Sequence, residues 1–349
     1  MTGAADFRSD TITRPTPAMR QAMAGAEVGD DVFGEDPTVR LLEEQVAARL
    51  GQEAGLFVPS GTMGNEIAVC VHTRPGDEVI LEATAHIFLY EGGAPAFLAG
   101  AQCLPLVGTR GLFDRRQLEE VLHSDDAHYP RSRLVAFENT HNRGGGRVLP
   151  QAALDDLCAL AHERGLATHL DGARLWNAAI ATGRPLAELA HPFDSISVCF
   201  SKGLGAPVGS VLSGSRAFIA EARRVRKKLG GGMRQVGILA AGALHALEHH
   251  FERLAEDHAR ARRLAEALAD LPGLCIDPAS VETNIVILEL TPEAPPPARW
   301  LDALRAEGVL AVAFGPRGIR LITHLDLDDA AIRHATSAFA RVAPTLAPR

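Results

Sequence analysis

Short apolar runs alternate along this chain with amphipathic helical stretches, and this alternation constrains the fold more than any other feature. It is typical of βαβ units, in which parallel strands form a sheet and helices cover its faces. Three of the runs end directly at polar residues: 134–137 at Glu138, 166–170 at Asp171, and 195–200 at Ser201 and Lys202. Ligands of open α/β sheets bind outside the carboxyl ends of the strands, so these runs predict one site at a single sheet edge.

The C-terminal part of the chain has a different pattern. An Ala- and Leu-rich helical region is expected after Gly237 and through about Leu271. Beyond it we expect strands over 283–290 and 319–323, and helices over 298–307 and from Asp328. We therefore predict an α/β fold: a large domain (16–245) with a mostly parallel central sheet flanked by helices, and a small C-terminal α+β domain (246–349), with the boundary between 240 and 275.

Composition excludes several classes of protein. The formal net charge of -8 argues against nucleic acid as the main partner. No apolar run reaches the roughly 18 residues of a membrane-spanning helix, and the first ten residues do not resemble a signal peptide. The five cysteines are scattered and form no CxxC pair, as expected for reduced thiols. We therefore expect a cytoplasmic enzyme.

The functional interpretation depends on Lys202. It directly follows an apolar run, so its amine is expected to be desolvated and able to form a Schiff base. Asp171 follows the preceding run, and a carboxylate there can keep a pyridine ring nitrogen protonated. Each residue also has an ordinary explanation, because most lysines are solvated and Asp171 could simply cap the next helix. Their order on neighbouring strands favours a pyridoxal-phosphate site.

A glycine-containing turn at 59–65 precedes an apolar helical stretch. Gly61 and Thr62 lie where this helix is expected to begin, and free N–H groups at a helix N-terminus bind phosphate. Ordinary helix capping would use the same residue types. The turn is not a P-loop, because no Gly-Lys-Ser/Thr sequence follows.

Three further residues have side chains suited to an amino-acid substrate. His86 follows the expected strand 78–82; an imidazole there could lie over a cofactor ring and transfer a proton, although a structural histidine is more common. Arg174 and Arg320 could bind a carboxylate through paired N–H groups. For Arg174 the ordinary alternative is a residue on a helix surface.

These residues lie in segments that resemble the low-specificity L-threonine aldolases, members of the aspartate-aminotransferase-like (fold type I) pyridoxal-phosphate enzymes. The resemblance covers nearly the whole chain, in seven ordered segments: RSDTITRP (8–15), GDDVFGEDP (29–37), ENTHN (138–142), HLDGAR (169–174), SKGLG (201–205), GGGMRQ (230–235) and RLITHLD (320–326). It implies pyridoxal 5'-phosphate as cofactor, an N-terminal segment (1–15) that contributes to the active site, and a homotetramer built from dimers with shared active sites.

The resemblance also implies a role for each candidate residue. Lys202 corresponds to the Schiff-base lysine, Asp171 to the partner of the pyridine nitrogen, and His86 to the histidine that stacks on the ring. The cofactor-binding set is completed by Gly61, Thr62, Arg174, Ser201 and, from a neighbouring subunit, Lys227 and Arg234. The substrate carboxylate corresponds to Ser9, Arg174 and Arg320, and the substrate hydroxyl to His86 and His128. No metal ligand is implied.

Two segments depart from the family pattern. Phe33 stands where many relatives carry tyrosine, so we assign it no hydrogen bond. The glycine-rich stretch 143–147 is shorter in some relatives, and we assign it no function.

The expected reaction is retro-aldol cleavage of L-threonine or L-allo-threonine, and of other β-hydroxy-α-amino acids, to glycine and an aldehyde. The base that removes the β-hydroxyl proton could be His86, His128 or a water molecule that they position. The nearest alternative is another fold type I enzyme: an aminotransferase, a β-eliminating lyase or a serine hydroxymethyltransferase. A nicotinamide enzyme that uses 203–209, a non-catalytic binding protein and a metallohydrolase are less well supported.

Overall fold

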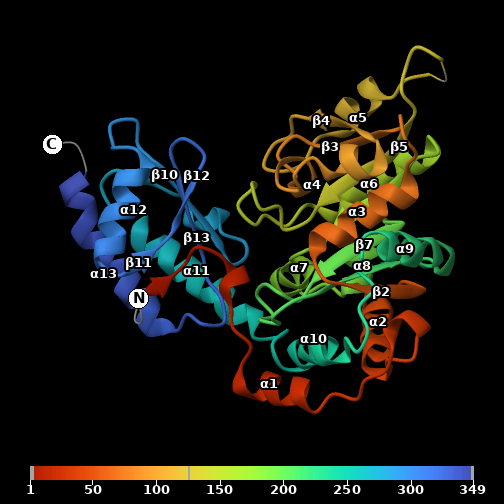
Figure 1. The fold of residues 1–349 in the computed structure, drawn as a ribbon. Helices are drawn as coiled ribbons and strands as arrows, with labels where there is room; N and C mark the ends of the chain where they lie inside the picture. The colour runs from red at the N-terminus through yellow and green to blue at the C-terminus, as the bar shows by residue number, and fades with distance from the viewer. Residues whose placement is uncertain (1–3, 125, 347–349) are drawn as a thin grey trace.

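The computed structural model describes residues 4–124 and 126–346, and its main element is a seven-stranded sheet (Figure 1). Its strands lie in the order β2 (Ala54–Val58), β8 (Ser210–Gly214), β7 (Ser195–Cys199), β6 (Ala167–Asp171), β5 (Ser132–Glu138), β3 (Glu78–Glu82) and β4 (Gln102–Leu106). Only β8 runs against the others in this sheet. The mostly parallel sheet that the sequence predicts is therefore confirmed.

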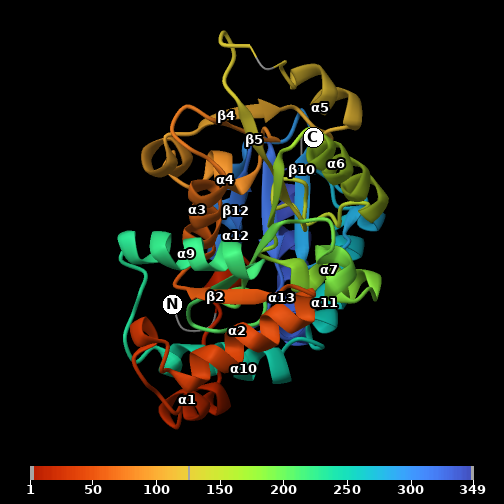
Figure 2. The same cartoon turned by 90° about the vertical axis from the view of Figure 1, so that its right-hand side faces the viewer.

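Both faces of this sheet are apolar because its strands are buried between two layers of helices. In β5, Leu134 and Ala136 join the hydrophobic cluster on one face, whereas Val135 and Phe137 join the cluster on the other. Figure 2 shows α3 (Gly61–His72) and α9 (Arg216–Lys228) on one side of the sheet, and α6 (Gln151–Glu163) and α7 (Leu175–Thr182) on the other. The expected flanking helices are thus confirmed.

The remaining helices of the large part surround this sandwich. They are α1 (Pro17–Ala24), α2 (Pro37–Leu50), α4 (His86–Leu89), α5 (Arg115–Val121), α8 (Leu186–Ala190) and α10 (Gly237–His249), with short helical turns η1 (Asp10–Ile12), η2 (Asp31–Phe33) and η3 (Pro95–Ala99). Side-chain oxygens of Thr16, Asp36 and Asp114 accept bonds from the first turns of α1, α2 and α5. These caps satisfy backbone N–H groups that would otherwise lack partners, which explains where the three helices begin.

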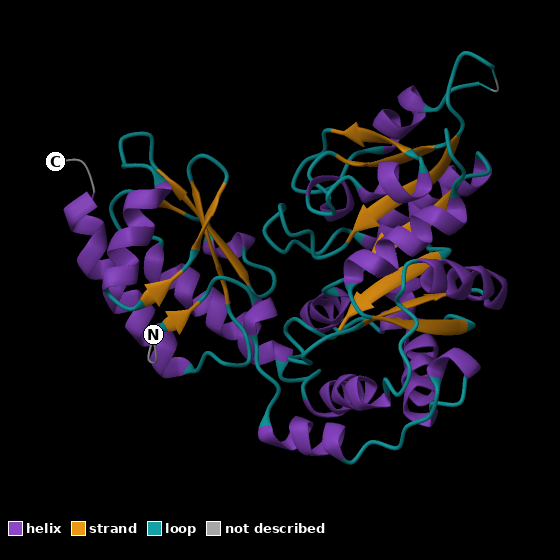
Figure 3. Cartoon of the chain, in the orientation of Figure 1, coloured by secondary structure: helices purple, strands orange, loops and turns teal. Residues whose placement is uncertain are grey.

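A second, smaller sheet lies in the C-terminal part, visible on the left of Figure 3. Its antiparallel strands have the order β12 (Val312–Phe314), β13 (Gly318–Ile322), β10 (Ile285–Leu290) and β9 (Leu274–Cys275). Its helices are α11 (Leu254–Leu268), α12 (Pro297–Ala306) and α13 (Asp329–Leu346), with the turn η4 (Pro278–Ser280). The N-terminal strand β1 (Ala5–Asp6) pairs with β11 (Val309–Leu310), and Phe7 is buried in this part's core.

The long helical region that the sequence predicts after Gly237 is two helices, because the chain turns at 251–253 between α10 and α11. The turn lets α10 pack against α1 and α2, while α11 packs against α13 and β10. No helix in the described part of the chain is long and apolar enough to cross a membrane.

Candidate active site

A pocket of about 410 Å³ lies between the carboxyl ends of the parallel strands and the small sheet. Six of the predicted residues line it: Ser9, His86, Asp171, Arg174, Lys202 and Arg320. They come from the N-terminal segment, from α4, from the ends of β6 and β7, and from β13. The single sheet edge that the three apolar runs predict is therefore where these side chains meet.

Asp171 is the last residue of β6 and is only 4% exposed. Its carboxylate accepts hydrogen bonds from Asn65 Nδ2, at 2.9 Å, and from the backbone N–H of Ala173, at 3.0 Å. These two donors fix the carboxylate at the pocket wall without supplying a positive charge. The site therefore retains a negative charge that suits a protonated pyridine nitrogen.

Lys202 lies in the turn that follows β7. Its backbone carbonyl accepts bonds from the N–H of Gly205, at 2.8 Å, and from the hydroxyl of Thr13, at 3.1 Å. Gly205 has φ +77°, a conformation that favours glycine, so the SKGLG sequence determines how this turn closes. The turn holds the lysine in the pocket lining, where the prediction for Lys202 requires it.

His86 is the first residue of α4, and its ring contacts Glu91 through one of its two nitrogens. Its Nδ1 lies 2.8 Å from Glu91 Oε1, and its backbone N–H donates to Glu138 at 2.7 Å. Burial lowers the pKa of His86, but the bond to Glu91 and the charges of Asp171, Glu91 and Glu138 outweigh it and hold the pKa above its usual value. Nε2 has no hydrogen-bond partner among the described residues, so it is available to a ligand.

Arg174 forms a buried ion pair with Asp10, a residue to which the sequence assigns no role. Its Nε and Nη2 each donate to the carboxylate of Asp10, both at 2.8 Å, and both side chains are buried. Burial raises the pKa of Asp10, but Arg174 more than offsets it, and the pKa lies well below its usual value. Asp10 belongs to the RSDTITRP segment, which is the only sequence signal that pointed to it.

Arg320 is less fully bonded. Its Nη1 donates to Asn142 Oδ1 at 2.8 Å and its Nη2 to the carbonyl of Arg8 at 3.3 Å. Its Nε is buried with no hydrogen-bond partner, and no carboxylate pairs with its guanidinium among the described residues. A partly buried guanidinium without a counter-ion suits an anionic ligand, so this side chain fits a substrate carboxylate.

The turn predicted to bind phosphate lies against the end of β7. Ser60 caps α3 through a bond from Met63 N–H, and Gly61 and Thr62 form the first turn of the helix. A Cβ on Gly61 would lie 2.7 Å from Cys199 Sγ, and one on Gly64 would lie 2.5 Å from Ser197 Oγ. Glycine at both positions therefore lets the helix N-terminus approach the strand that leads to Ser201 and Lys202.

His128 does not line this pocket, so a single chain does not test its predicted role near the substrate hydroxyl. It lies in the loop before β5, with its side chain 87% exposed and bonded to Asp126 at 2.7 Å. The pocket is at the other end of β5, and seven strand residues span about 20 Å. The resemblance identified His128 by its position in the sequence, but it did not indicate at which end of the sheet His128 lies.

Lys227 and Arg234 also lie outside the pocket. Both are exposed; Lys227 is in the last turn of α9, and Arg234 pairs with Asp30 at 2.9 Å. Because the prediction assigns them to a neighbouring subunit's site, one chain does not test it.

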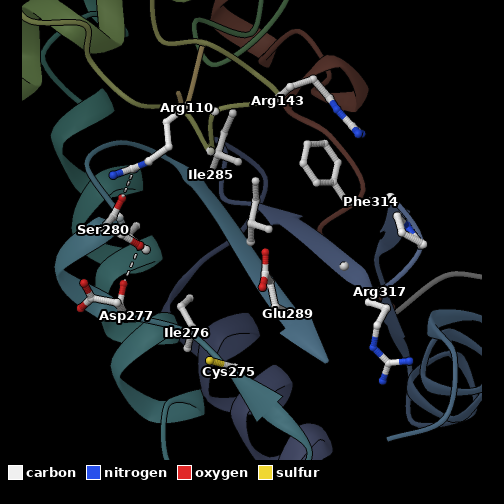
Figure 4. A pocket seen from close by; sticks show the side chains of 17 residues that line it. Arg110, Arg143, Cys275, Ile276, Asp277, Ser280, Ile285, Glu289, Phe314 and Arg317 are labelled. Atoms are coloured by element: carbon white, nitrogen blue, oxygen red, sulfur yellow. Dashed lines mark hydrogen bonds between the residues drawn. The ribbon is translucent and has the colours of Figure 1, made fainter. Parts of the chain in front are cut away.

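A second pocket, of about 660 Å³, lies between the small sheet and the segments that contain Arg110 and Gly144 (Figure 4). It adjoins the first at Arg143 and Phe314, which line both, and the Arg143 guanidinium lies 4.2 Å from the centre of the Phe314 ring. The glycine-rich stretch 143–147 thus forms part of the wall between the pockets. None of the predicted site residues lines the second pocket, so the smaller one is the candidate active site.

Comparison with known proteins agrees with this geometry. Residues 6–291 match the β-eliminating lyase family. The chain is 43% identical over 346 residues to low-specificity L-threonine aldolase 1 of Arabidopsis thaliana, covering 98% of this chain and 97% of that protein. It is 42% identical to the low specificity L-threonine aldolase of Escherichia coli K12, covering 92% and 94% of the two chains.

Solved structures give the same fold. The Leishmania major threonine aldolase has a TM-score of 0.81 at 22% identity, and covers 97% of this chain and 99% of its own. An aspartate aminotransferase from Rhodobacter sphaeroides has a TM-score of 0.75 at 19% identity, covering 99% of this chain and 93% of its own. At these identities the likeness establishes the fold alone.

Proposed function

Because the chain belongs to the β-eliminating lyase family, with the low-specificity L-threonine aldolases as relatives, we propose that it is a pyridoxal-phosphate-dependent aldolase. Its substrates are L-threonine, L-allo-threonine and other β-hydroxy-α-amino acids, and its products are glycine and an aldehyde. The observation that carries the proposal is the one pocket that combines Lys202, Asp171, His86 and Arg320.

The residues present fit the cofactor. Bound pyridoxal phosphate supplies an electron sink, which makes the Cα–Cβ bond of an attached amino acid easier to break. Lys202 would hold its aldehyde carbon, and Asp171 would hold its ring nitrogen. Both hydrogen-bond donors to Asp171 are neutral, so its charge is free to pair with that nitrogen. The glycines of α3 let the helix N-terminus lie close to the end of β7, where its free N–H groups would bind the phosphate near Ser201.

The substrate carboxylate is assigned mainly to Arg320. Its Nε is buried without a partner, whereas Arg174 has already donated two of its N–H groups to Asp10. Arg174 can contribute only its remaining Nη1, because its positive charge is already paired with Asp10. The Ser9 hydroxyl, which accepts a bond from Thr11, keeps its own proton to donate to the carboxylate.

Proton transfer is assigned to His86. With Nδ1 bonded to Glu91, its Nε2 can accept the β-hydroxyl proton, and the charged ring that results is stabilised by Glu91. The raised pKa makes the imidazole a stronger base near neutral pH. A water molecule next to His86 is the alternative base, and His128 could act only from another copy of the chain.

We also propose a cytoplasmic homotetramer built from dimers. Exposed apolar side chains occur in and next to two short helices, α4, which begins with the pocket residue His86, and η3: Phe88, Leu89, Tyr90, Phe97 and Leu98, called here the α4–η3 patch. Apolar clusters of this kind commonly mark protein interfaces. A second copy on this patch would be the source of Lys227, Arg234 and His128, and the free cysteines suit a reducing compartment.

The direct test measures acetaldehyde and glycine release from L-threonine and L-allo-threonine with added pyridoxal phosphate. We expect turnover by the wild type and none by Lys202→Ala. Transfer of the amino group to a keto acid, measured in parallel, would instead identify an aminotransferase. Bound cofactor without acetaldehyde release would leave the cofactor assignment intact and reject the aldolase.

A further inference from the structure

A buried carboxylate lies directly behind His86. The Glu91 side chain has no exposed surface, and its Oε1 accepts bonds from Asn65 Nδ2 and from His86 Nδ1, both at 2.8 Å. The same Asn65 nitrogen donates to Asp171 Oδ2 at 2.9 Å. Its amide oxygen faces His169 Nε2 at 3.1 Å, so the nitrogen is the atom directed at the two acids. One amide therefore joins the partner of His86 to the predicted partner of the cofactor ring.

A second carboxyl lies next to Glu91. Glu66, on α3, is 1% exposed and lies within hydrogen-bond reach of Glu91. Three of the pair's four oxygens, Glu66 Oε1 and Oε2 and Glu91 Oε2, are buried without a partner. If both acids were ionised, they would repel each other and neither could donate a hydrogen bond. One proton shared between Glu66 and Glu91 provides the donor and removes the repulsion.

The surroundings decide which acid holds that proton. Glu91 already accepts two hydrogen bonds and faces a histidine that can be positively charged, so its environment favours the charged form. Glu66 has no protein donor in the described residues. Burial, with the neighbouring Glu91, raises the pKa of Glu66 to about 9. Because both Glu66 oxygens also lack a donor, we assign the shared proton to Glu66.

We propose that Glu91, held by a hydrogen bond from neutral Glu66, is the positioning residue that keeps the His86 proton on Nδ1 and the Nε2 lone pair in the pocket. The inference rests on the aldolase function proposed above. When the β-hydroxyl proton moves to Nε2, the pair keeps one negative charge and no proton leaves it. Glu66 therefore limits the charge behind His86 to one carboxylate.

Other charged groups also face these side chains. His86 is faced by Asp171 from β6, by Glu138 from β5, which accepts its backbone N–H, and by Tyr90, the residue that follows α4. Lys202 and Arg320 share its pocket. Glu66 is faced by the thiols of Cys70 and Cys103. Neither thiol bridges Glu66 to His86, so Glu91 is the link between them.

The experiment compares Glu91→Gln with Glu66→Gln, using Glu221→Gln at an exposed surface position as the control. Glu91→Gln removes the charge, so the apparent pKa of the His86-dependent limb of the rate profile should fall by about one unit. Glu66→Gln replaces the acid with an amide that still donates to Glu91, and should move the limb by clearly less. Equal shifts in both variants, or none in Glu91→Gln, would overturn the proposal.

A spectroscopic measurement that requires no turnover tests the shared proton independently of the aldolase activity. Infrared spectra of the holoenzyme with ¹³C-labelled glutamate should contain the C=O band of a protonated, buried carboxylic acid at neutral pH. The band should be absent from Glu66→Gln. If wild type has the band but releases no acetaldehyde, the function fails and the shared proton stands; if it releases acetaldehyde without the band, the pair does not share a proton. Absence of the band from the wild type would overturn the shared proton without any variant. Its presence is assigned by comparison with Glu66→Gln, because burial also raises the pKa of Glu43.

Discussion

At the residue scale, the Asp10–Arg174 ion pair determines the stability of the pocket wall. Asp10→Asn leaves the buried guanidinium without its charge partner, and we expect a loss of about 3–5 kcal/mol of unfolding free energy. Because folding lowers the pKa of Asp10, its contribution is present above the unfolded pKa, about 4, and is lost as the pH falls towards the folded value. Denaturant unfolding at neutral and acidic pH measures this; a variant as stable as the wild type would show that the pair is dispensable.

His86 makes the second prediction at this scale. If its Nε2 accepts the β-hydroxyl proton, His86→Asn should lower kcat for threonine by roughly 100- to 10,000-fold, because asparagine cannot take up a proton. Cofactor binding, measured by absorbance, should change much less. The same kcat in His86→Asn as in the wild type would assign the step to water or to His128 of another copy.

At the element scale, the close packing of α3 against β7 places the helix N-terminus. A Cβ on Gly64 would lie 2.5 Å from Ser197 Oγ and 3.3 Å from Ser197 Cβ, so in Gly64→Ala the buried hydroxyl must rotate and the helix must shift slightly from the strand. We expect weaker binding of pyridoxal phosphate by about 1–3 kcal/mol, measured by titration. Gly25→Ala, where the new Cβ would make only an ordinary contact at 3.5 Å, is the control. Unchanged affinity in Gly64→Ala would separate this packing from phosphate binding.

The arrangement of the elements also explains which parts of the site the sequence could predict. Asp171 and Lys202 follow neighbouring parallel strands, so strand order alone brings them to one edge. Asp10 and Arg174 are 164 residues apart. The N-terminal segment reaches the pocket through long-range contacts, among them the pairing of β1 with β11, the burial of Phe7 and the bond from Thr13 to the Lys202 carbonyl. Such contacts have no local signal. His86 and Glu91 are only five residues apart, but the segment between them could direct their side chains in many ways, so the sequence did not predict their bond.

At the scale of the whole molecule, the α4–η3 patch leads to the last prediction. Phe97, in this patch, is 86% exposed, and Tyr90, from the same patch, lines the pocket. If a second copy covers the patch, Phe97→Asp places a charge in an apolar interface and should shift the protein to smaller species in sedimentation experiments. Aldolase activity should fall with it, because the partner's Lys227, Arg234 and His128 are lost.

Val107 offers a matched control for that experiment. It is 78% exposed and apolar like Phe97, but it follows β4 and does not belong to the patch. Val107→Asp should therefore keep the assembly and the activity of the wild type. If Phe97→Asp behaves like Val107→Asp, the interface lies elsewhere. If it dissociates the protein and leaves kcat intact, one chain holds a complete site, and the roles predicted for Lys227, Arg234 and His128 are wrong.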